Sequence, residues 1–460
     1  MSVPRYDSYR DSGVEWLGEV PSHWAVMRLK RLCDIRPSNV DKKAHEGEEA
    51  VRLCNYTDVY YNEKITADFD LMEATASLDQ IGRFQLMADD VIITKDSETA
   101  DDIAIAAYVP EDMPGVVCGY HLALLRPSRD TSGKFLKRYF DSIFAKSCFA
   151  ARANGLTRVG LSQYSLSNVE VPLPPPSEQA AIAAFLDRET AKIDALVEEQ
   201  RRLIALLGEK RQAVISHAVT KGLDPTVPMK DSGVEWLGEV PAHWEVLTLG
   251  RVIQCIEQGW SPAAHERAPE PGEASVLRLS AIKDGVFWPN ERKALPDLSE
   301  SALASAPKVR EGDFFFTRAN TPDLVGDCAI AYGVWGTIFS DLIYRLYFVD
   351  RLVLPEYMIY LFRSPIVRSQ IKRDARGSSM SMAKISHGHI KSWWIALPPI
   401  DEQKDIIKRI STEVAANLDL LREAQSAITL LQERRAALIS AAVTGKIDVR
   451  GLVPAVEEAA

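Results

Sequence analysis

Few residues in this sequence have the spacing that catalysis or cofactor binding requires. Gly133-Lys134 is followed by Phe and Gly445-Lys446 by Ile, whereas a phosphate-binding loop places Ser or Thr there to hold the metal. No dinucleotide-binding G-x-G, zinc-binding H-E-x-x-H or nucleophile G-x-S-x-G motif is present. His387 and His389 flank Gly388 in a loop-like setting, which does not predict a metal site. We therefore expect a binding protein with no active site, metal or cofactor of its own.

The charge of the chain is unevenly distributed. The 460 residues carry a net charge of −10, which argues mildly against nucleic acid as a ligand. Residues 58–112 hold fourteen acidic and three basic residues, whereas residues 133–158 hold six basic residues and one acid, and residues 355–391 hold seven and two. Because binding depends on the local field, these two basic strips indicate a polyanion as a candidate ligand.

Cysteine usage and hydropathy indicate a cytoplasmic protein. Six cysteines are scattered without a C-x-x-C pair, which argues against a zinc site and a disulfide framework. No run of eighteen apolar residues exists, and the first residues lack the apolar segment of a signal peptide. We expect no membrane contact.

The chain is a tandem duplication. Three segments recur with offsets of 220 to 224 residues: DSGVEWLGEVPSHW at 11–24 with DSGVEWLGEVPAHW at 231–244, LPPPSEQ at 173–179 with LPPIDEQ at 397–403, and EKRQAVISHAVTKGLD at 209–224 with ERRAALISAAVTGKID at 433–448. The stretches between them match only weakly. Similar ends predict a shared scaffold or partner surface, and divergent middles predict two different ligands.

A long amphipathic helix is predicted after each LPP segment, with Ser177 as a candidate N-cap of the first. Apolar residues recur at helical spacing: Ile182, Leu186, Ile193, Leu196, Leu203, Leu207 and Val214, then Ile406, Ile410, Leu420, Leu421, Ile428, Leu431 and Leu438, interrupted by Asn417. About 45 residues at ~1.5 Å each give ~67 Å, longer than a small domain, which favours two helices that pair with each other. The alternative is that each packs on a separate core.

The divergent middles read as compact α/β pieces. Runs such as VIITK and HLALLRP in the first, and DFFFTR and LIYRLYFV in the second, are rich in strand-forming residues. A helix is expected after each set, at about 133–152 and 355–375, and these helices carry the basic strips.

The repeated motifs together resemble the specificity subunit of Type I DNA restriction-modification enzymes. The resemblance implies an α+β fold: two similar α/β target-recognition domains joined by two long antiparallel coiled-coil helices, with pseudo-two-fold symmetry. The corresponding segments are 1–172 (first recognition domain), 173–222 (first spacer helix), 223–396 (second recognition domain), 397–448 (second spacer helix) and 449–460 (C-terminal tail).

The same resemblance implies a division of labour. The chain would read a bipartite, asymmetric site on double-stranded DNA. Two methyltransferase subunits would methylate adenine with S-adenosylmethionine, and two motor-nuclease subunits would use ATP and Mg. The rival interpretation is a duplicated coiled-coil adaptor that assembles proteins without reading DNA.

Two places in each domain match the family's DNA-reading elements. One is the turn after the DVIITK or DFFFTR strand, where Arg and Lys can bond guanine and Asn can bond adenine. The other is the basic strip and the turn after it, whose cations more often hold phosphates. The candidates are Thr94, Lys95, Asp96, Ser97, Lys137, Arg138, Lys146, Arg152, Asn154 and Arg158, then Thr317, Arg318, Asn320, Thr321, Arg368, Lys372, Arg373, Arg376, Ser378 and Lys384.

The first domain departs from the second around the first of these turns. It has Asp89 in place of Gly312, and we align Ala100-Asp101-Asp102 with Val325-Gly326-Asp327, so we expect a loop of different shape.

The fourteen-residue repeat is expected to hold each domain to the scaffold, with direct contact to the methyltransferase as the alternative. Expected scaffold or partner contacts are Trp16, Leu17, Trp24, Leu186, Ile193, Leu207, Trp236, Leu237, Trp244, Ile410, Leu421 and Leu431.

Overall fold

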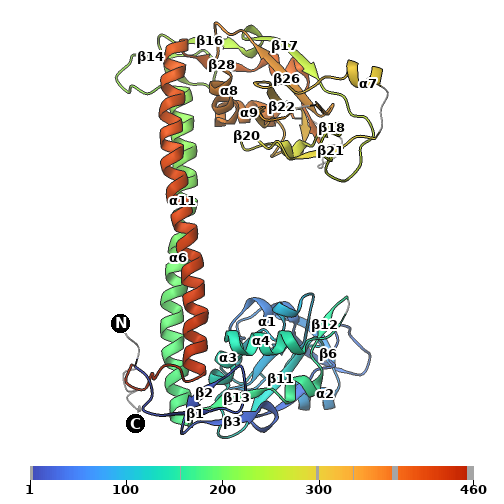
Figure 1. The fold of residues 1–460 in the computed structure, drawn as a ribbon, viewed down its shortest axis with the longest axis vertical. Helices are drawn as coiled ribbons and strands as arrows, with labels where there is room; N and C mark the ends of the chain where they lie inside the picture. Colours follow the sequence, from blue (N-terminus) through green and yellow to red (C-terminus); the bar gives the residue numbers. More distant parts are fainter. Residues whose placement is uncertain (1–3, 156, 297–299, 335, 376–381, 453–460) are drawn as a thin grey trace. The chain divides into compact units, whose positions relative to one another are not determined.

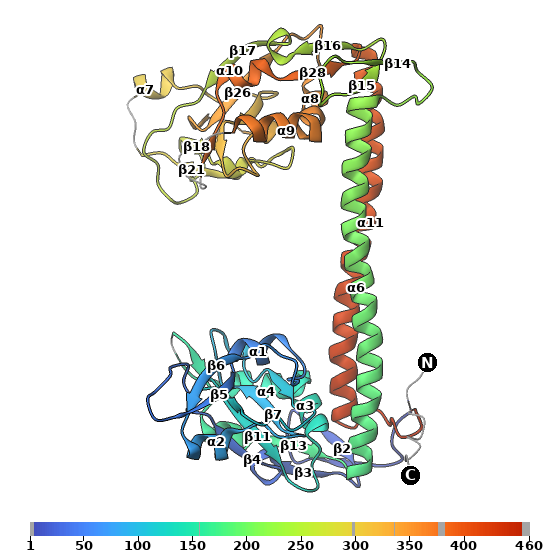
Figure 2. The same ribbon diagram turned by 180° about the vertical axis from the view of Figure 1, so that it is seen from behind.

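The computed structural model describes residues 4–155, 157–296, 300–334, 336–375 and 382–452. They form two compact units. The first comprises the described residues of Met1–Arg201 and Gln425–Ala460, and the second those of Arg202–Ala424. Figures 1 and 2 show the same plan within each unit: an α/β domain lies beside one end of each of two long helices.

The two long helices are α6 (Pro176–Lys221) and α11 (Ile400–Val443). In the first unit, Ile182 and Leu186 from the start of α6 pack with Ile439 and Val443 from the end of α11. In the second unit, Ile215 and Val219 from the end of α6 pack with Ile406 and Ile410 from the start of α11. The helices therefore run antiparallel in both units, as predicted.

The buried seam of these helices differs in detail from the predicted one. α6 already begins at Pro176, so Ser177 lies inside the helix and is not its N-cap. Leu196 and Leu203 are 45% and 41% exposed, and Val197 is buried instead. Asn417 is buried at 3% exposure. The apolar seam drifts around an α-helix because its period is 3.6 residues, so a strict heptad pattern misplaces some positions.

A four-stranded antiparallel sheet forms the centre of each α/β domain. The order is β4-β11-β7-β9 in the first and β17-β26-β22-β24 in the second, so the topology is the same. The strands are β4 (Cys33–Pro37), β7 (Val91–Thr94), β9 (Ala106–Tyr108) and β11 (Leu122–Pro127), then β17 (Ile253–Gln258), β22 (Phe314–Thr317), β24 (Cys328–Ile330) and β26 (Ile343–Phe348). A second sheet accompanies each, with β5 (Glu49–Cys54) between β6 (Met72–Ala76) and β10 (Val116–Cys118), and β18 (Ser275–Leu277) between β21 (Arg292–Ala294) and β25 (Thr337–Phe339).

Both faces of the central strands are buried, because consecutive residues of a strand point to opposite faces. Ile92 of β7 belongs to one apolar cluster, whereas Val91 and Ile93 belong to another. In β22, Phe315 faces one cluster and Phe314 and Phe316 face another. This explains why both segments read as continuous apolar runs.

Short helices cover the sheets. The first domain contains α1 (Tyr56–Tyr61), α2 (Leu78–Phe84), α3 (Gly133–Asp141), α4 (Ile143–Arg152) and α5 (Gln163–Ser167), and the second contains α7 (Glu300–Ser305), α8 (Pro355–Arg363), α9 (Pro365–Asp374) and α10 (His387–Ser392). Each helix expected to carry a basic strip is therefore two helices. Ser142 and Ser364 break them, and each hydroxyl accepts a hydrogen bond from a backbone N–H of the following helix.

Small two-stranded sheets complete each unit. The hairpin β1–β2 (Tyr9–Asp11, Glu19–Pro21) has the same register as β14–β15 (Met229–Asp231, Glu239–Pro241). Likewise β3–β13 (Ala25–Arg28, Glu170–Leu173) matches β16–β28 (Glu245–Thr248, Trp394–Leu397). The ladders β8–β12 (Asp96–Ser97, Val159–Gly160) and β23–β27 (Ala319–Asn320, Ala383–Lys384) also correspond, and β19–β20 (Ile282–Lys283, Val286–Phe287) lies in the second domain.

The fourteen-residue repeat ends on the long helix. Trp24 Nε1 donates to Glu178 Oε2 at 3.0 Å, and His23 Nε2 lies 2.7 Å from Glu178 Oε1. Trp244 Nε1 makes the same bond to Glu402 Oε2 at 3.1 Å. Both glutamates belong to the repeated LPP-x-x-EQ segment, so two motifs that are far apart in sequence form one joint in each unit. These contacts hold the end of each repeat to its long helix, and the architectural role of the whole repeat stays a prediction.

Within the part of the chain that the structure describes, no helix is long and apolar enough to cross a membrane. The C-terminal residues pack onto the first unit, since Val449 is buried in a cluster with Tyr6.

Candidate nucleic-acid interface

Lys95, the residue after β7, is fixed by its backbone between two other segments. Its N–H donates to His121 O at 3.1 Å, and its carbonyl accepts from Leu161 N at 2.9 Å. Its ammonium lies 4.6 Å from the centre of the Tyr120 ring and donates to Ser38 O at 3.1 Å. Burial lowers the pKa of Lys95, an effect that neighbouring Asp96 partly opposes.

Asp96 ties together the polar side chains around Lys95. Its Oδ2 lies 2.8 Å from His121 Nδ1, and its Oδ1 lies 3.0 Å from Arg158 Nη2. The Arg158 guanidinium also stands 5.8 Å from the centre of the Tyr56 ring. The pKa of Tyr56 is raised, chiefly by burial. A carboxylate that holds an arginine on an exposed face fixes the direction in which the remaining donors point.

The second domain has the same backbone frame. Arg318, the residue after β22, donates its N–H to Leu342 O at 2.9 Å, and its carbonyl accepts from Ile385 N at 2.8 Å. Its guanidinium stands 5.3 Å from the centre of the Tyr344 ring, and its Nη1 donates to Asp341 O at 3.2 Å. Its Nε is buried and has no hydrogen-bond partner among the described residues.

Other polar groups surround Arg318. Asp341 Oδ1 accepts a hydrogen bond from Ser261 Oγ at 2.5 Å. The His387 ring lies 4.4 Å from that of Tyr344, and burial, Lys391 and Arg318 lower the pKa of His387. The frame is therefore common to both domains, whereas the side chains that it displays differ. Two domains that bind different base sequences need a common backbone with different side chains, because the hydrogen-bond donors and acceptors of side chains determine base specificity.

We expected the backbone of the first domain to differ in shape from that of the second on either side of this frame. This prediction is partly wrong. Asp89 and Gly312 both adopt a positive φ, of 69° and 84°, so the backbone is alike there. Ala104, with φ 59°, donates its N–H to Thr94 O at 3.1 Å, just as Gly326, with φ 80°, donates to Thr317 O at 2.8 Å. Gly326 thus corresponds to Ala104 and not to a residue of 100–102, so the predicted correspondence is wrong.

The hydroxyl residues at the two turns have structural roles. Thr94 Oγ1 accepts from Ile105 N at 3.0 Å, and Thr317 Oγ1 accepts from Asp327 N at 3.0 Å. Thr94, Ser97 and Thr317 are all buried. Their assignment to a DNA surface is therefore wrong for this structure, because their side chains do not reach the solvent.

The basic strip of the first domain is largely neutralised inside the protein. Lys137 and Arg138 are each 4% exposed. Lys137 Nζ lies 2.7 Å from Asp141 Oδ2, and Arg138 Nη2 lies 2.6 Å from Asp187 Oδ1 of α6. Both also lie 3.2 Å from Glu63 Oε2, which comes from the acidic segment. The prediction that these two residues bind DNA is wrong, because carboxylates already occupy their charges.

Two further arginines of the strips support the fold. Arg152 pairs with Glu170 at 3.2 Å. Arg368 donates to the carbonyls of Val325 at 2.7 Å and Asp323 at 2.8 Å, and burial lowers its pKa. Among the other candidates, the exposed ones are Lys146, Asn154, Arg158, Thr321, Lys372, Arg373 and Lys384, and Asn320 is partly buried. Arg376 and Ser378 lie outside the described residues.

The expected scaffold contacts fall into two groups. Most are buried or partly buried: Leu17, Trp24, Leu186, Ile193, Leu207, Leu237, Trp244, Ile410, Leu421 and Leu431. Trp16 and Trp236 are instead 60% and 44% exposed.

Four residues that complete the two frames were not among the predicted ones: Tyr120, His121, Tyr344 and Asp341. The available signal was position: Tyr120 and His121 directly precede the apolar run LALL, at the same edge of the sheet as Lys95. Among the described residues, no group of three metal-ligating side chains could hold a metal ion.

Residues 21–204 match the family described as the Type I restriction modification DNA specificity domain. The Type I restriction enzyme EcoKI specificity subunit of Escherichia coli (strain K12) is 24% identical over 377 residues, which cover 79% of this chain and 76% of that protein. The putative type I restriction enzyme MjaX specificity subunit of Methanocaldococcus jannaschii is 24% identical over 443 residues, which cover 94% and 96%. In sequence, the chain is thus similar to Type I specificity subunits.

A solved structure has the same fold as this chain. It is that of a chain from a study of complex assembly and conformational transition in the type I R-M system, with a TM-score of 0.69 and 17% identity. The likeness covers 92% of this chain and 98% of that chain.

Proposed function

We propose that this chain is the non-catalytic DNA-recognition component of a Type I restriction-modification complex. It reads a bipartite, asymmetric target on double-stranded DNA, one half with each α/β domain. The recognition domains are assigned to residues 1–172 and 223–396, the spacer helices to 173–222 and 397–448, and the tail to 449–460. The observation that carries the proposal is the backbone frame shared by Lys95 and Arg318, which displays different side chains in the two domains.

The base-reading residues are assigned to these frames. Lys95 and Arg158 in the first domain, and Arg318 in the second, are cations with free or partly free donors beside an exposed edge. Arg and Lys pair with guanine O6 and N7 in the major groove. Lys146, Lys372 and Lys384 are exposed lysines whose charge suits phosphates.

The catalytic steps are assigned to partner subunits. Two methyltransferase subunits would supply adenine methylation with S-adenosylmethionine, and two motor-nuclease subunits would supply ATP- and Mg-dependent translocation and cleavage. The complex would act in the cytoplasm. The polar side chains around Lys95 and Arg318 do not support the rival adaptor function. An adaptor that only assembles proteins has no need for two sites with different polar side chains.

Salt-dependent binding tests the proposal. The chain is mixed with its methyltransferase subunit and titrated with duplex DNA at several salt concentrations. Phosphate contacts release counterions, so the logarithm of the binding constant should fall linearly with the logarithm of salt concentration, by about 0.9 per phosphate contact. A binding constant that does not change with salt, or no binding at all, would favour the adaptor.

A further inference from the structure

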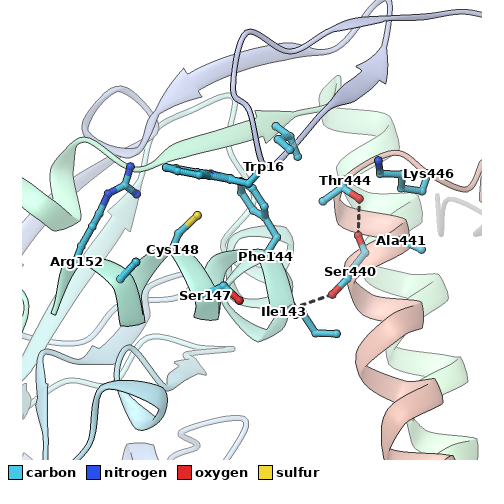
Figure 3. A pocket seen from close by; sticks show the side chains of 12 residues that line it. Trp16, Ile143, Phe144, Ser147, Cys148, Arg152, Ser440, Ala441, Thr444 and Lys446 are labelled. Atoms are coloured by element: carbon cyan, nitrogen blue, oxygen red, sulfur yellow. Dashed lines mark hydrogen bonds between the residues drawn. The ribbon is translucent and has the colours of Figure 1, made fainter.

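Two arginines near the end of the first basic strip have different surroundings. Arg152 pairs with Glu170 at 3.2 Å and stands 5.7 Å from the centre of the Trp16 ring, at the edge of an apolar pocket of about 710 Å³ (Figure 3). Arg158 is instead 48% exposed, and its Nη2 forms an ion pair with Asp96 Oδ1 at 3.0 Å. Arg158 therefore belongs to the polar edge of the first frame, whereas Arg152 belongs to the pocket.

Asp96 has one partner on each of its carboxylate oxygens. Its Oδ2 lies 2.8 Å from His121 Nδ1, and its buried Oδ1 faces Arg158 Nη2. A carboxylate only accepts hydrogen bonds, so His121 Nδ1 carries the proton and donates it. In the neutral imidazole the other ring nitrogen, Nε2, is then a hydrogen-bond acceptor. Asp96 thus sets the polarity of the nitrogen that His121 offers to a ligand.

His121 is held in place from three directions. Its carbonyl accepts the N–H of Lys95 at 3.1 Å, its Nδ1 is bonded to Asp96, and the Tyr120 ring stands edge-on with its centre 4.8 Å away. The side chain is nevertheless 35% exposed, and Nε2 has no hydrogen-bond partner in the part of the chain that the structure describes. An oriented acceptor therefore lies at the same edge as the Lys95 ammonium, which is a donor.

The second domain has a different pair of side chains at these places. The backbone bond that ends on the His121 carbonyl in the first domain ends on the Leu342 carbonyl in the second. Ala319 occupies the ladder position that corresponds to Asp96. Leucine and alanine side chains neither donate nor accept hydrogen bonds. The oriented acceptor is thus particular to the first domain, and a base that it contacts lies in the first half-site.

We propose that His121 reads one base of the first half-site as a hydrogen-bond acceptor, and that Asp96 is the positioning residue that gives His121 this polarity. In the major groove an acceptor pairs with an exocyclic amine, N6 of adenine or N4 of cytosine, and is repelled by the carbonyl oxygens of guanine and thymine. The proposal rests on the proposed function, because it requires that the chain binds DNA. It adds the kind of base that one residue selects.

The substitution Asp96→Asn tests the polarity of His121. An amide has one acceptor, its oxygen, and one donor, its NH2 group. Arg158 offers only donors, so the amide oxygen should stay beside Arg158 and the NH2 group should face His121 Nδ1. Nδ1 then becomes an acceptor, and the proton moves to Nε2, which becomes a donor. The preferred base at one position of the first half-site should change from adenine or cytosine to guanine or thymine.

Methylation mapping in cells that carry the methyltransferase subunit measures this preference. The unmodified chain should favour its preferred base at that position by about tenfold. His121→Leu and Asp96→Ala introduce the residues that the second domain has at these places. Both should reduce the discrimination at the same position without creating a new preference. The second half-site should stay unchanged in all three variants, which shows that the chain is folded and active.

Asp79→Asn is the matched control. Asp79 also lies near an arginine, with Arg83 at 3.8 Å, and among the described residues it has no histidine partner. Its substitution should leave both half-sites unchanged. If Asp96→Asn modifies no DNA in cells, the purified variant and its methyltransferase subunit are titrated with four duplexes that differ only at this base pair. Tightest binding to the guanine or thymine duplex supports the proposal, and equal binding to all four contradicts it.

The proposal is overturned if Asp96→Asn keeps the preference of the unmodified chain, or exchanges adenine for cytosine, since both bases carry the amine. It is also overturned if His121→Leu reduces discrimination at no position. If the unmodified chain and its methyltransferase subunit modify no defined sequence, the proposed function itself fails, and the two failures are thereby distinguished.

Discussion

The charge of Glu63 is expected to hold the first α/β domain against the paired helices. Its carboxylate lies 3.2 Å from both Lys137 Nζ and Arg138 Nη1, and it also contacts Arg435 of α11. Burial by itself would raise the pKa of Glu63, but these three cations lower it to about 2. Glu63→Gln keeps the shape of the side chain and removes its charge, so the buried cations lose one of their carboxylates.

The size of the effect follows from the pKa and the exposure. A fall from the usual 4.5 to about 2 corresponds to roughly 3.4 kcal/mol at about 1.4 kcal/mol per pKa unit. The side chain is 44% exposed, so after solvent screening we expect Glu63→Gln to lower the free energy of unfolding by about 1–2 kcal/mol at pH 7. Because the folded pKa lies below the unfolded one, this stabilisation is complete above about pH 4.5 and disappears as the pH falls toward 2.

Urea unfolding of the full chain, monitored by hydrogen exchange at the amides of α3, measures this free energy of unfolding. Asp79→Asn is the matched control, since Asp79 is 79% exposed and lies 3.8 Å from Arg83. Asp79→Asn should lower the free energy of unfolding by less than about 0.5 kcal/mol. The reasoning is refuted if Glu63→Gln unfolds like the unmodified chain at pH 7, or if its deficit is as large at pH 3 as at pH 7.

The other predictions concern recognition and spacing. Lys95→Ala should relax the sequence specificity at one half-site only, and Arg318→Ala at the other, as measured by methylation mapping. If either substitution instead weakens DNA binding equally for all sequences, the residue contacts phosphates. Four residues inserted after Glu199 lengthen the helix by ~6 Å and turn it by a net ~40°. One base pair adds ~3.4 Å of duplex, so the spacer between the half-sites should grow by about one or two base pairs. An active variant with an unchanged spacer would show that another element sets the spacer length. Residues 1–225 alone should pair with themselves and, with the methyltransferase, modify a symmetric site; an asymmetric site would contradict this.

Features that depend on local pattern could be predicted from the sequence. The repeated segments predicted the tandem duplication. The apolar periodicity and the preceding prolines predicted the positions of both long helices. Docking of the final tryptophan of the repeat against a helix could also be predicted, although the residue that it contacts could not. Glu178 lies 154 residues from Trp24, and no spacing rule connects them.

Features that depend on contacts between distant segments could not be predicted. Lys137 and Arg138 read as a DNA-binding strip because their neighbours in sequence are basic, but Glu63 of the acidic segment neutralises them from 75 residues away. The displaced alignment near Ala104 has a similar cause, because a non-glycine residue there adopts a positive φ that sequence would assign to glycine. The side chains that surround Lys95 likewise come from three separate segments.

Methylation-site mapping tests the central claim most directly. DNA from cells that carry this chain and its methyltransferase subunit is sequenced by a method that detects methylated adenine. We predict a bipartite, asymmetric target whose two halves depend separately on the first and second α/β domains, so that exchanging either domain changes one half alone. A continuous target, a symmetric one, or methylation that does not change when a domain is exchanged would contradict the account.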